Sequence, residues 1–541
     1  MLTDALYLLA PEIVLVVLAV SIYLGGLFIE SPRVWRWIAL GGVAVAGVCL
    51  AVLPPRAAAG VPLQMDPLAD HVRLLALLAG ALLVLLAWRT HAGTETPEFL
   101  GSLLLIVAGV MLTAAAKDLV LLFLGLELVS IPTYLLLYLG RRDAASQEAA
   151  AKYFYLSILA SAALLYGFSF LYGAAGSMDL GEIQTRLTGP SASADGFLPL
   201  AKVGLVLVFA GLGFRIAAVP FHFYAPDVYQ GTTHANAALL SVAPKIAGFV
   251  VLVRLVAVAL AGIHAAAWPI AVVLATVTMT LGNVVALWQN NLRRLLAYSS
   301  IAHAGYMLIG LAVYMAPRVE PSEQWSEQWN GLGAILFYLA AYAAATLGTF
   351  AALAYLGEDR REIEDVEELA GLAWTGGPIR PVLAWVIALF MLSLAGIPPL
   401  FGFWGKLAVF GSALSVGGLE SQVRPWLVAL AVIGVVNSAV AAAYYLRVVA
   451  VMFFRLPLGT PPTKPDAGGT LTAALGCAAL VVLLGLFPGR WLRETNFAAP
   501  KHARPPAVAS IPTKPRPAVA PFSRPALGPL SDPQPDSQQH S

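Results

Sequence analysis

The chain has few charged residues. Only 11% of its 541 residues are Asp, Glu, Lys or Arg, whereas a soluble domain has about 25%. The formal net charge is +2, which gives no indication of binding to nucleic acid or to an acidic partner. Hydrophobic residues make up 59% of the sequence. This composition excludes an ordinary soluble domain and places the chain in a lipid bilayer.

Cysteine is equally scarce. The two cysteines, Cys49 and Cys477, lie inside apolar runs and are expected to be small buried hydrophobic residues. Their number and separation exclude a disulfide framework. The histidines do not cluster at the spacing of metal ligands, and the sequence contains no Gly-rich phosphate loop. The sequence therefore predicts no nucleotide, iron–sulfur cluster, haem or metal site in this chain.

Long apolar runs are abundant instead. About 20 apolar residues cross the hydrocarbon core as a helix, and such runs recur from Leu6 to Phe487. The sequence predicts an all-α membrane protein with about fourteen transmembrane helices. The predicted helices are 5–29, 34–53, 67–88, 99–115, 119–139, 149–173, 199–219, 233–258, 266–288, 295–316, 331–356, 381–415, 425–453 and 470–488.

The seventh and twelfth predicted helices are broken, at Pro220 and at Pro398-Pro399. Proline removes a backbone hydrogen bond, and in a membrane the freed backbone is tolerated only against protein or water. Each break falls in the fourth helix of a five-helix block, 99–258 or 259–453. This correspondence predicts an internal repeat whose breaks line an ion path. The alternative is that the prolines kink these helices only for packing.

The rest of the chain is predicted to form an N-terminal three-helix segment (1–98), a region with the last transmembrane helix (454–496) and a tail (497–541). The tail is rich in Pro, Ser and Ala and is expected to be disordered. The loop charges predict a multi-pass protein of the cell inner membrane with the N-terminus and the tail outside the cytoplasm. The residues assigned to the cytoplasmic side are Arg33, Arg36, Arg89, Arg141, Arg142, Arg293, Arg294, Arg360, Arg361, Arg380, Arg455 and Lys464.

Charged residues inside helices are the candidate functional residues. An ionised group near the bilayer centre costs about 2.5–3.5 kcal/mol, so such groups must pair, hydrate or lose their charge. A row of groups that exchange protons would form a proton relay. The candidates are Glu127, Lys152, Arg215, His222, Lys245, His303 and Lys406.

Each candidate also has a purely structural interpretation. Glu127, Lys245 and Lys406 could belong to structural ion pairs, and Lys152 could extend to the interface by snorkelling. His222 and His303 could be hydrogen-bonded core histidines. For Arg254 and Arg447, near helix ends, snorkelling is the favoured interpretation. Asp227 is expected to cap or to form a salt bridge with the segment after the break.

The order of these motifs is similar to that in the antiporter-like membrane subunits of respiratory complex I, an NADH:quinone oxidoreductase. The motifs are "GLELVS", "KYFYLS", "GFRIAAVPFHFYAPDVYQG", "SVAPK", "NNLRRLLAYSSIAHAGY" and "AGIPPLFGFWGK". The resemblance covers about residues 5–490. "PDVYQG" followed by "SVAPK" is typical of one branch of this family, since the other branches carry a different sequence after the proline break.

The resemblance implies inverted repeats and a chain of buried charges that moves protons, driven by quinone reduction elsewhere in a multisubunit membrane complex. NADH, flavin, iron–sulfur clusters and quinone are then expected in other subunits. Glu127 would be the carboxylate partner of the cation in the seventh helix. Lys245 would be the central proton carrier and Lys406 the terminal relay residue, with Lys152 and His303 beside that axis.

Two departures from the family pattern bear on the mechanism. The family usually has lysine where this chain has Arg215, and arginine does not release its proton. The family also usually has prolines after the "VYQG" turn, where this chain reads Thr232 to Asn236. Two alternatives stay open: a subunit of a multisubunit sodium/proton antiporter, and a scaffold that has lost pumping.

Overall fold

The computed structural model describes residues 2–53, 60–90, 95–141, 143–189, 197–317, 330–357, 362–374, 377–415, 422–457 and 468–500. Within these ranges the chain forms helices and three isolated β-bridges. The helices are α1 (Leu2–Leu8), α2 (Ala10–Gly26), α3 (Pro32–Val52), α4 (Pro67–Thr90), α5 (Thr96–Ala115), α6 (Leu119–Gly140), α7 (Ala144–Ala175), α8 (Leu180–Thr188), α9 (Phe197–Arg215), α10 (Tyr224–Gly231), α11 (His234–Arg254), η1 (Leu255–Ala259), η2 (Ala261–Ile263), α12 (His264–Ala286), α13 (Leu292–Met315), α14 (Gly331–Leu356), η3 (Val366–Leu369), α15 (Ile379–Ala395), α16 (Phe401–Ser415), α17 (Arg424–Phe454), α18 (Gly468–Leu486) and α19 (Pro488–Ala498).

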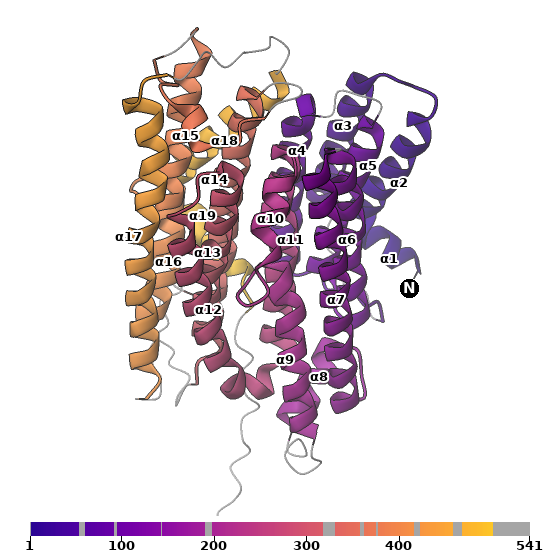
Figure 1. The fold of residues 1–541 in the computed structure, drawn as a ribbon. Coiled ribbons are helices and arrows are strands. Elements are labelled where there is room, and N and C mark those ends of the chain that lie inside the picture. Colours follow the sequence, from indigo (N-terminus) through magenta and orange to yellow (C-terminus); the bar gives the residue numbers. More distant parts are fainter. Residues whose placement is uncertain are drawn as a thin grey trace, which may run out of the picture. The chain divides into compact units, whose positions relative to one another are not determined.

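Among the described residues, twelve helices are long and apolar enough to cross a membrane, and α2 and α15 are shorter apolar helices. Each of the fourteen predicted helices corresponds to one of these fourteen; the last part of the 381–415 prediction is α16. The all-α membrane fold is therefore confirmed. In Figure 1 these helices run side by side, with α17 at one edge and α1 to α3 at the opposite edge.

Several helix boundaries differ from the predicted ones. The region of the first predicted helix forms two helices, α1 and α2, because the chain leaves helical geometry at Leu9. The seventh helix ends at Arg215 rather than at 219. Ala217 has a positive φ of 56°, and the Pro220 ring disfavours the helical conformation for the residue before it. The short amphipathic helices α8 and α19 were not predicted. Because α19 extends to Ala498, the predicted tail boundary at 497 is wrong by two residues, and residues 501–541 lie outside the described part of the chain.

Short polar side chains define where the functional helices begin. Asp118 accepts a hydrogen bond from the Leu121 amide at 2.6 Å at the start of α6, and Asn291 accepts one from the Arg294 amide at 3.1 Å at the start of α13. Such caps satisfy amides that have no partner inside the helix. The caps fix the starts of α6 and α13, which carry the candidate residues Glu127 and His303.

Three helices occupy the interior. In the most apolar 18-residue stretches of α11, α13 and α14, 94%, 94% and 100% of the residues are buried, whereas in that of α17 only 33% are buried. Glycine allows the backbones of α13 and α14 to approach closely, because a Cβ on Gly310 would lie 2.5 Å from the Gly331 carbonyl oxygen. Small residues at such contacts are typical of membrane helix pairs. The candidate residues on α11 and α13 are therefore shielded from lipid.

Candidate functional site: two clusters of buried charge

Glu127 of α6 and Arg215 of α9 form a buried ion pair, with Arg215 Nη2 2.7 Å from Glu127 Oε1. The Arg215 side chain is 4% exposed and that of Glu127 is 20% exposed. Ser161 of α7 donates to the same carboxylate oxygen at 2.6 Å and accepts from Arg215 at 3.0 Å. Arg215 also donates to the Leu126 carbonyl at 3.1 Å and to the Ser130 hydroxyl. The guanidinium is thus held by four partners from two helices.

Lys245 of α11 has a different environment. It is 2% exposed, and its Nζ donates to the Ser300 hydroxyl at 2.6 Å and to the Ser300 carbonyl. The Tyr342 hydroxyl donates to the same serine at 2.8 Å, and Lys245 Nζ lies 5.0 Å from the centre of the Tyr342 ring. No carboxylate among the described residues forms a salt bridge with Lys245. Hydroxyl and carbonyl oxygens solvate the amine instead.

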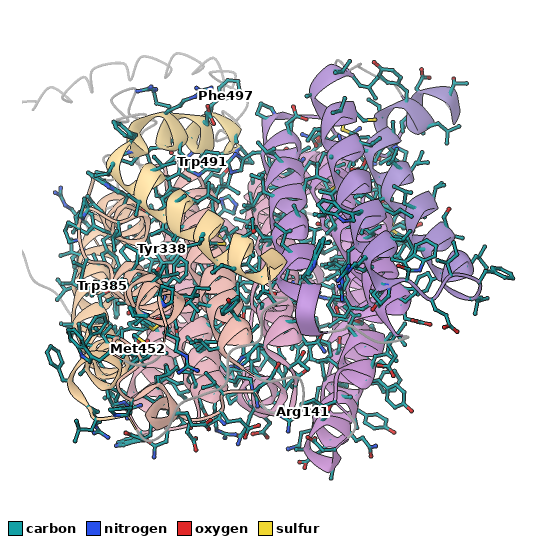
Figure 2. All side chains as sticks on the ribbon, turned by 90° about the horizontal axis from the view of Figure 1, so that it is seen from above. Arg141, Tyr338, Trp385, Met452, Trp491 and Phe497 are labelled. Atoms are coloured by element: carbon teal, nitrogen blue, oxygen red, sulfur yellow. The ribbon has the colours of Figure 1, made fainter. Side chains whose placement is uncertain are left out.

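His303 lies one helical turn beyond Ser300 on α13 and is 3% exposed. Its Nδ1 is 2.7 Å from the Tyr338 hydroxyl, and its Nε2 is 3.0 Å from the Tyr445 hydroxyl. The tautomer decides which atom donates in each contact. Tyr445 is also hydrogen-bonded to Ser299. Figure 2 shows the molecule from above, with Tyr338 among the helices of the C-terminal half. Both ring nitrogens therefore have a partner that can accept or donate a proton.

Lys406 lies on α16, just after the second break, and is 5% exposed. Its Nζ donates to the Ala395 carbonyl at 2.9 Å, at the end of α15. This end carries partial negative charge, which favours a cation. Gly396 follows with a φ of 88°, and a Cβ there would lie 2.8 Å from Lys406 Cδ. The break at residues 396–400 thus creates the place that Lys406 occupies.

One face of α13 joins the two lysines. Ser300, His303 and Tyr306 follow at intervals of three residues, so they lie along the same side of the helix. Ser300 contacts Lys245, and the ring of Tyr306 lies 5.0 Å from Lys406 Nζ. Six residues span about 9 Å along the helix. The structure therefore brings Lys245, His303 and Lys406 together, as predicted for a relay, through hydroxyl groups that the sequence analysis did not single out.

Lys152 and His222 lie elsewhere. Lys152 forms salt bridges with Glu148 at 2.6 Å and Asp227 at 2.9 Å, and its side chain is 40% exposed. Asp227 also accepts from Arg294 at 2.7 Å, which agrees with its expected salt-bridging role after the break. His222 is half-buried between α9 and α10. No hydrogen bond or salt bridge among the described residues joins either residue to Lys245.

The snorkelling interpretation of Arg254 is wrong. Arg254 is fully buried and donates to both carboxylate oxygens of Asp66, at 2.5 and 2.7 Å, and to the Ala114 carbonyl. Arg447 donates to the carbonyls of Leu287 and Gln289, just after the end of α12. Both arginines therefore connect segments that are far apart in the sequence.

Comparisons with known proteins identify the family of the chain. The family model described as "NADH:quinone oxidoreductase/Mrp antiporter, TM" matches residues 116–436. A protein of Granulibacter bethesdensis named NADH-quinone oxidoreductase subunit N is 36% identical over 501 residues, which are 91% of this chain and 98% of that protein. The chain belongs to the NADH-quinone oxidoreductase subunit N family. The branch indicated by "PDVYQG" and "SVAPK" is thereby confirmed.

Other relatives support the same assignment. The subunit N of Desulfovibrio desulfuricans is 38% identical over 507 residues, which are 89% of this chain and 94% of that protein. A chain of respiratory complex I from Thermus thermophilus has a TM-score of 0.72 and 33% identity, and the match covers 89% of this chain and 98% of that one. A chain of the Mrp complex from Dietzia has a TM-score of 0.74 at 21% identity, with 92% and 97% covered. The last match shows the shared fold only.

Proposed function

We propose that this subunit N family member translocates protons as a membrane subunit of an NADH-quinone oxidoreductase, and that protons move from Lys245 through His303 to Lys406. One observation carries the proposal. The two buried lysines have no carboxylate salt bridge among the described residues, and the face of α13 that joins them carries groups able to accept and donate protons. A buried amine without a counter-charge loses its proton far more readily than an exposed one.

Arg215 has a separate role in this proposal. A guanidinium stays protonated at any accessible pH, so Arg215 acts as a fixed positive charge. Its salt bridge holds the Glu127 carboxylate 2.7 Å from this charge. Lengthening or breaking that contact would change the electrostatic potential at the relay, which is how a fixed pair can influence proton transfer without carrying a proton.

The energy source lies outside this chain. NADH, flavin, iron–sulfur clusters and quinone are assigned to other subunits of the complex, and the partners of this chain are the other membrane subunits and the lipid. The loop charges support an inner-membrane location with the N-terminus outside the cytoplasm. A cysteine placed at Asp143 should resist impermeant thiol reagents in intact cells, and labelling from outside would reverse this orientation.

The relay is tested by removing each amine. In assembled complex reconstituted into proteoliposomes, Lys245→Ala and Lys406→Ala should each abolish most of the proton uptake that quinone reduction drives. Lys202→Ala, at an exposed position of α9, is the matched control and should pump normally. Normal proton uptake by either relay variant would refute the proposed path.

The rival function is sodium/proton antiport without a redox partner. The shared fold with the Mrp chain is compatible with it, but the names of the curated relatives at 36% and 38% identity favour the quinone-linked enzyme. Proton uptake that depends on quinone reduction and not on a sodium gradient separates the two functions.

A further inference from the structure

A network of ion pairs lies where α6 ends and where α11 and α13 begin. Arg293 of α13 is fully buried and forms salt bridges with Glu362 at 2.6 Å and Glu364 at 2.8 Å. Arg141, which follows α6, bridges to Glu364 at 3.0 Å. The two glutamates lie in the segment that follows α14. Glu362 therefore lies beside the starts of α11 and α13.

The two glutamates differ although they share Arg293. Burial raises the pKa of the Glu362 carboxyl above its usual value, and Arg293 offsets this only in part. Burial also opposes ionisation of Glu364, but the charge of Arg293 and the hydrogen bonds from Arg141 and Arg293 outweigh it, so the pKa of Glu364 is lowered. Neighbouring groups with opposite shifts are suited to different tasks. Glu362 is the one of the two that holds a proton more readily.

His234 begins α11 directly beside Glu362. Its backbone amide donates to both Glu362 carboxylate oxygens at 3.1 Å, and its side chain is fully buried, with its ring centre 6.1 Å from that of Phe350 on α14. The ring approaches the Ile363 backbone, yet neither ring nitrogen has a hydrogen-bond partner of normal geometry among the described residues. A buried imidazole without such partners is unusual, because buried polar groups are normally satisfied.

A column of polar groups leads from His234 to Lys245. The two residues are eleven positions apart on α11, about three turns and 16 Å, so they share a face of the helix. Ser241 lies on that face between them, and the Tyr229 hydroxyl contacts both Ser241 and Ser300. On α14, Thr346 lies one turn from Tyr342 and near its hydroxyl, and the Thr346 hydroxyl has no hydrogen-bond partner among the described residues. Ser300 completes the column by accepting from Lys245.

We propose that Glu362 and His234 form the entrance of the proton path to Lys245, with His234 passing protons from the Glu362 carboxyl into this column of hydroxyl groups. The inference rests on the proposed role of Lys245. His234 accepts a proton on one ring nitrogen and releases one from the other, so the ring returns to a neutral state. The step from His234 to the level of Thr346 is about one helical turn, which a water molecule bridges while the path is hydrated.

Chemical rescue distinguishes a proton-passing role from a structural one. His234→Ala should lower quinone-driven proton uptake by about a hundredfold, the low end of what proton-transfer groups contribute. Added imidazole should restore a large part of it by occupying the space that the side chain leaves. His264→Ala, at the start of α12, is the control and should show neither the loss nor an imidazole effect. His234→Gln fills the site without a titratable ring, so it should assemble and stay slow.

Glu362→Gln supplies a second comparison. It should slow proton uptake, whereas Glu364→Gln, which changes the other partner of Arg293, should have a much smaller effect. Normal uptake by His234→Gln, or no response of assembled His234→Ala complex to imidazole, would overturn the inference. If Lys245→Ala pumps normally, the proposed function itself fails; if Lys245→Ala is inactive while both His234 variants pump normally, only the entrance is wrong.

Discussion

The two clusters of buried charge solve the same physical problem in opposite ways. At Arg215, the cation is neutralised by Glu127 and held by a further serine network. At Lys245 and Lys406, the cations lie among hydroxyl groups, a helix end and aromatic rings. Desolvation of a charge is expensive unless a partner compensates it. In the first cluster an ion pair compensates the desolvation. In the second, under the proposed function, the amines become neutral.

The difference explains why arginine occurs at one position and lysine at the other two. A guanidinium makes several hydrogen bonds in a fixed plane and keeps its charge, which suits the four partners of Arg215. A lysine amine can discharge when poorly solvated, which suits a carrier. The resemblance noted from the sequence leads us to expect lysine at position 215, so under the proposed function this chain would separate a fixed charge from proton-carrying groups more sharply than that pattern does.

Removing the guanidinium should have the largest effect. Arg215→Ala leaves the partly buried Glu127 carboxylate without its cation, which costs up to about 3–5 kcal/mol of stability. The assembled complex should lose this subunit at a lower temperature in a thermal dissociation experiment. The double variant Arg215→Gln with Glu127→Gln removes both charges and should recover much of the loss. A double variant no more stable than Arg215→Ala would show that the pair does not account for the defect.

Neutralising the carboxylate should affect function more than assembly. Glu127→Gln preserves the shape and a hydrogen-bond acceptor for Arg215, so the complex should assemble. Quinone-driven proton uptake should fall, since the fixed pair no longer tunes the relay. Proton uptake per assembled complex is the measurement, and unchanged uptake with glutamine would remove Glu127 from the mechanism.

The charged residues of both clusters were predictable from the sequence, and most of their partners were not. Glu127 and Lys245 stand out because a charge in an apolar helix is expensive. Ser300, Tyr342 and Tyr445 carry no such signal, because a hydroxyl is tolerated in many helices. Only helical spacing hints at some of these partners. Ser300 precedes His303 by three residues, and Tyr342 follows Tyr338 by four.

Long-range pairing accounts for the clearest error. Arg254 was placed at the interface because it is near a helix end, but its partner Asp66 is 188 residues away in the sequence. The amphipathic helices α8 and α19 were missed for another reason: they are too short to span a membrane and have no long apolar run. Hydrophobic length predicts spanning helices well, but it does not predict short helices outside the spans.

Replacing the His303 imidazole should have an intermediate effect on proton uptake, because His303 lies between Lys245 and Lys406 and away from the Glu127–Arg215 pair. His303→Gln keeps hydrogen-bonding capacity toward Tyr338 and Tyr445 but cannot take up a proton. Proton uptake should fall by about a hundredfold or more, while the thermal dissociation temperature stays close to that of the unmodified complex. A histidine that only stabilises the core would give the reverse result, with lower stability and normal uptake.

Truncation should give the smallest effect. All contacts that form the two clusters lie within Met1–Lys501, which forms one compact unit. The cut belongs after Lys501 rather than at the predicted tail boundary, because α19 packs against α4 and α14. The truncated complex should assemble and take up protons as the full-length one does, because the contacts of both clusters are intact. Loss of assembly would assign the Pro-rich tail a docking role.

Two charge-conserving exchanges test the central claim most directly. Arg215→Lys keeps a cation beside Glu127, and Lys245→Arg keeps a cation at the relay but removes its ability to discharge. Charge alone would give both variants the same mild phenotype. The account predicts that, in proteoliposomes and per assembled complex, Arg215→Lys retains quinone-driven proton uptake and Lys245→Arg loses most of it. Normal proton uptake by Lys245→Arg would contradict the account, because the relay would then have no carrier at its centre.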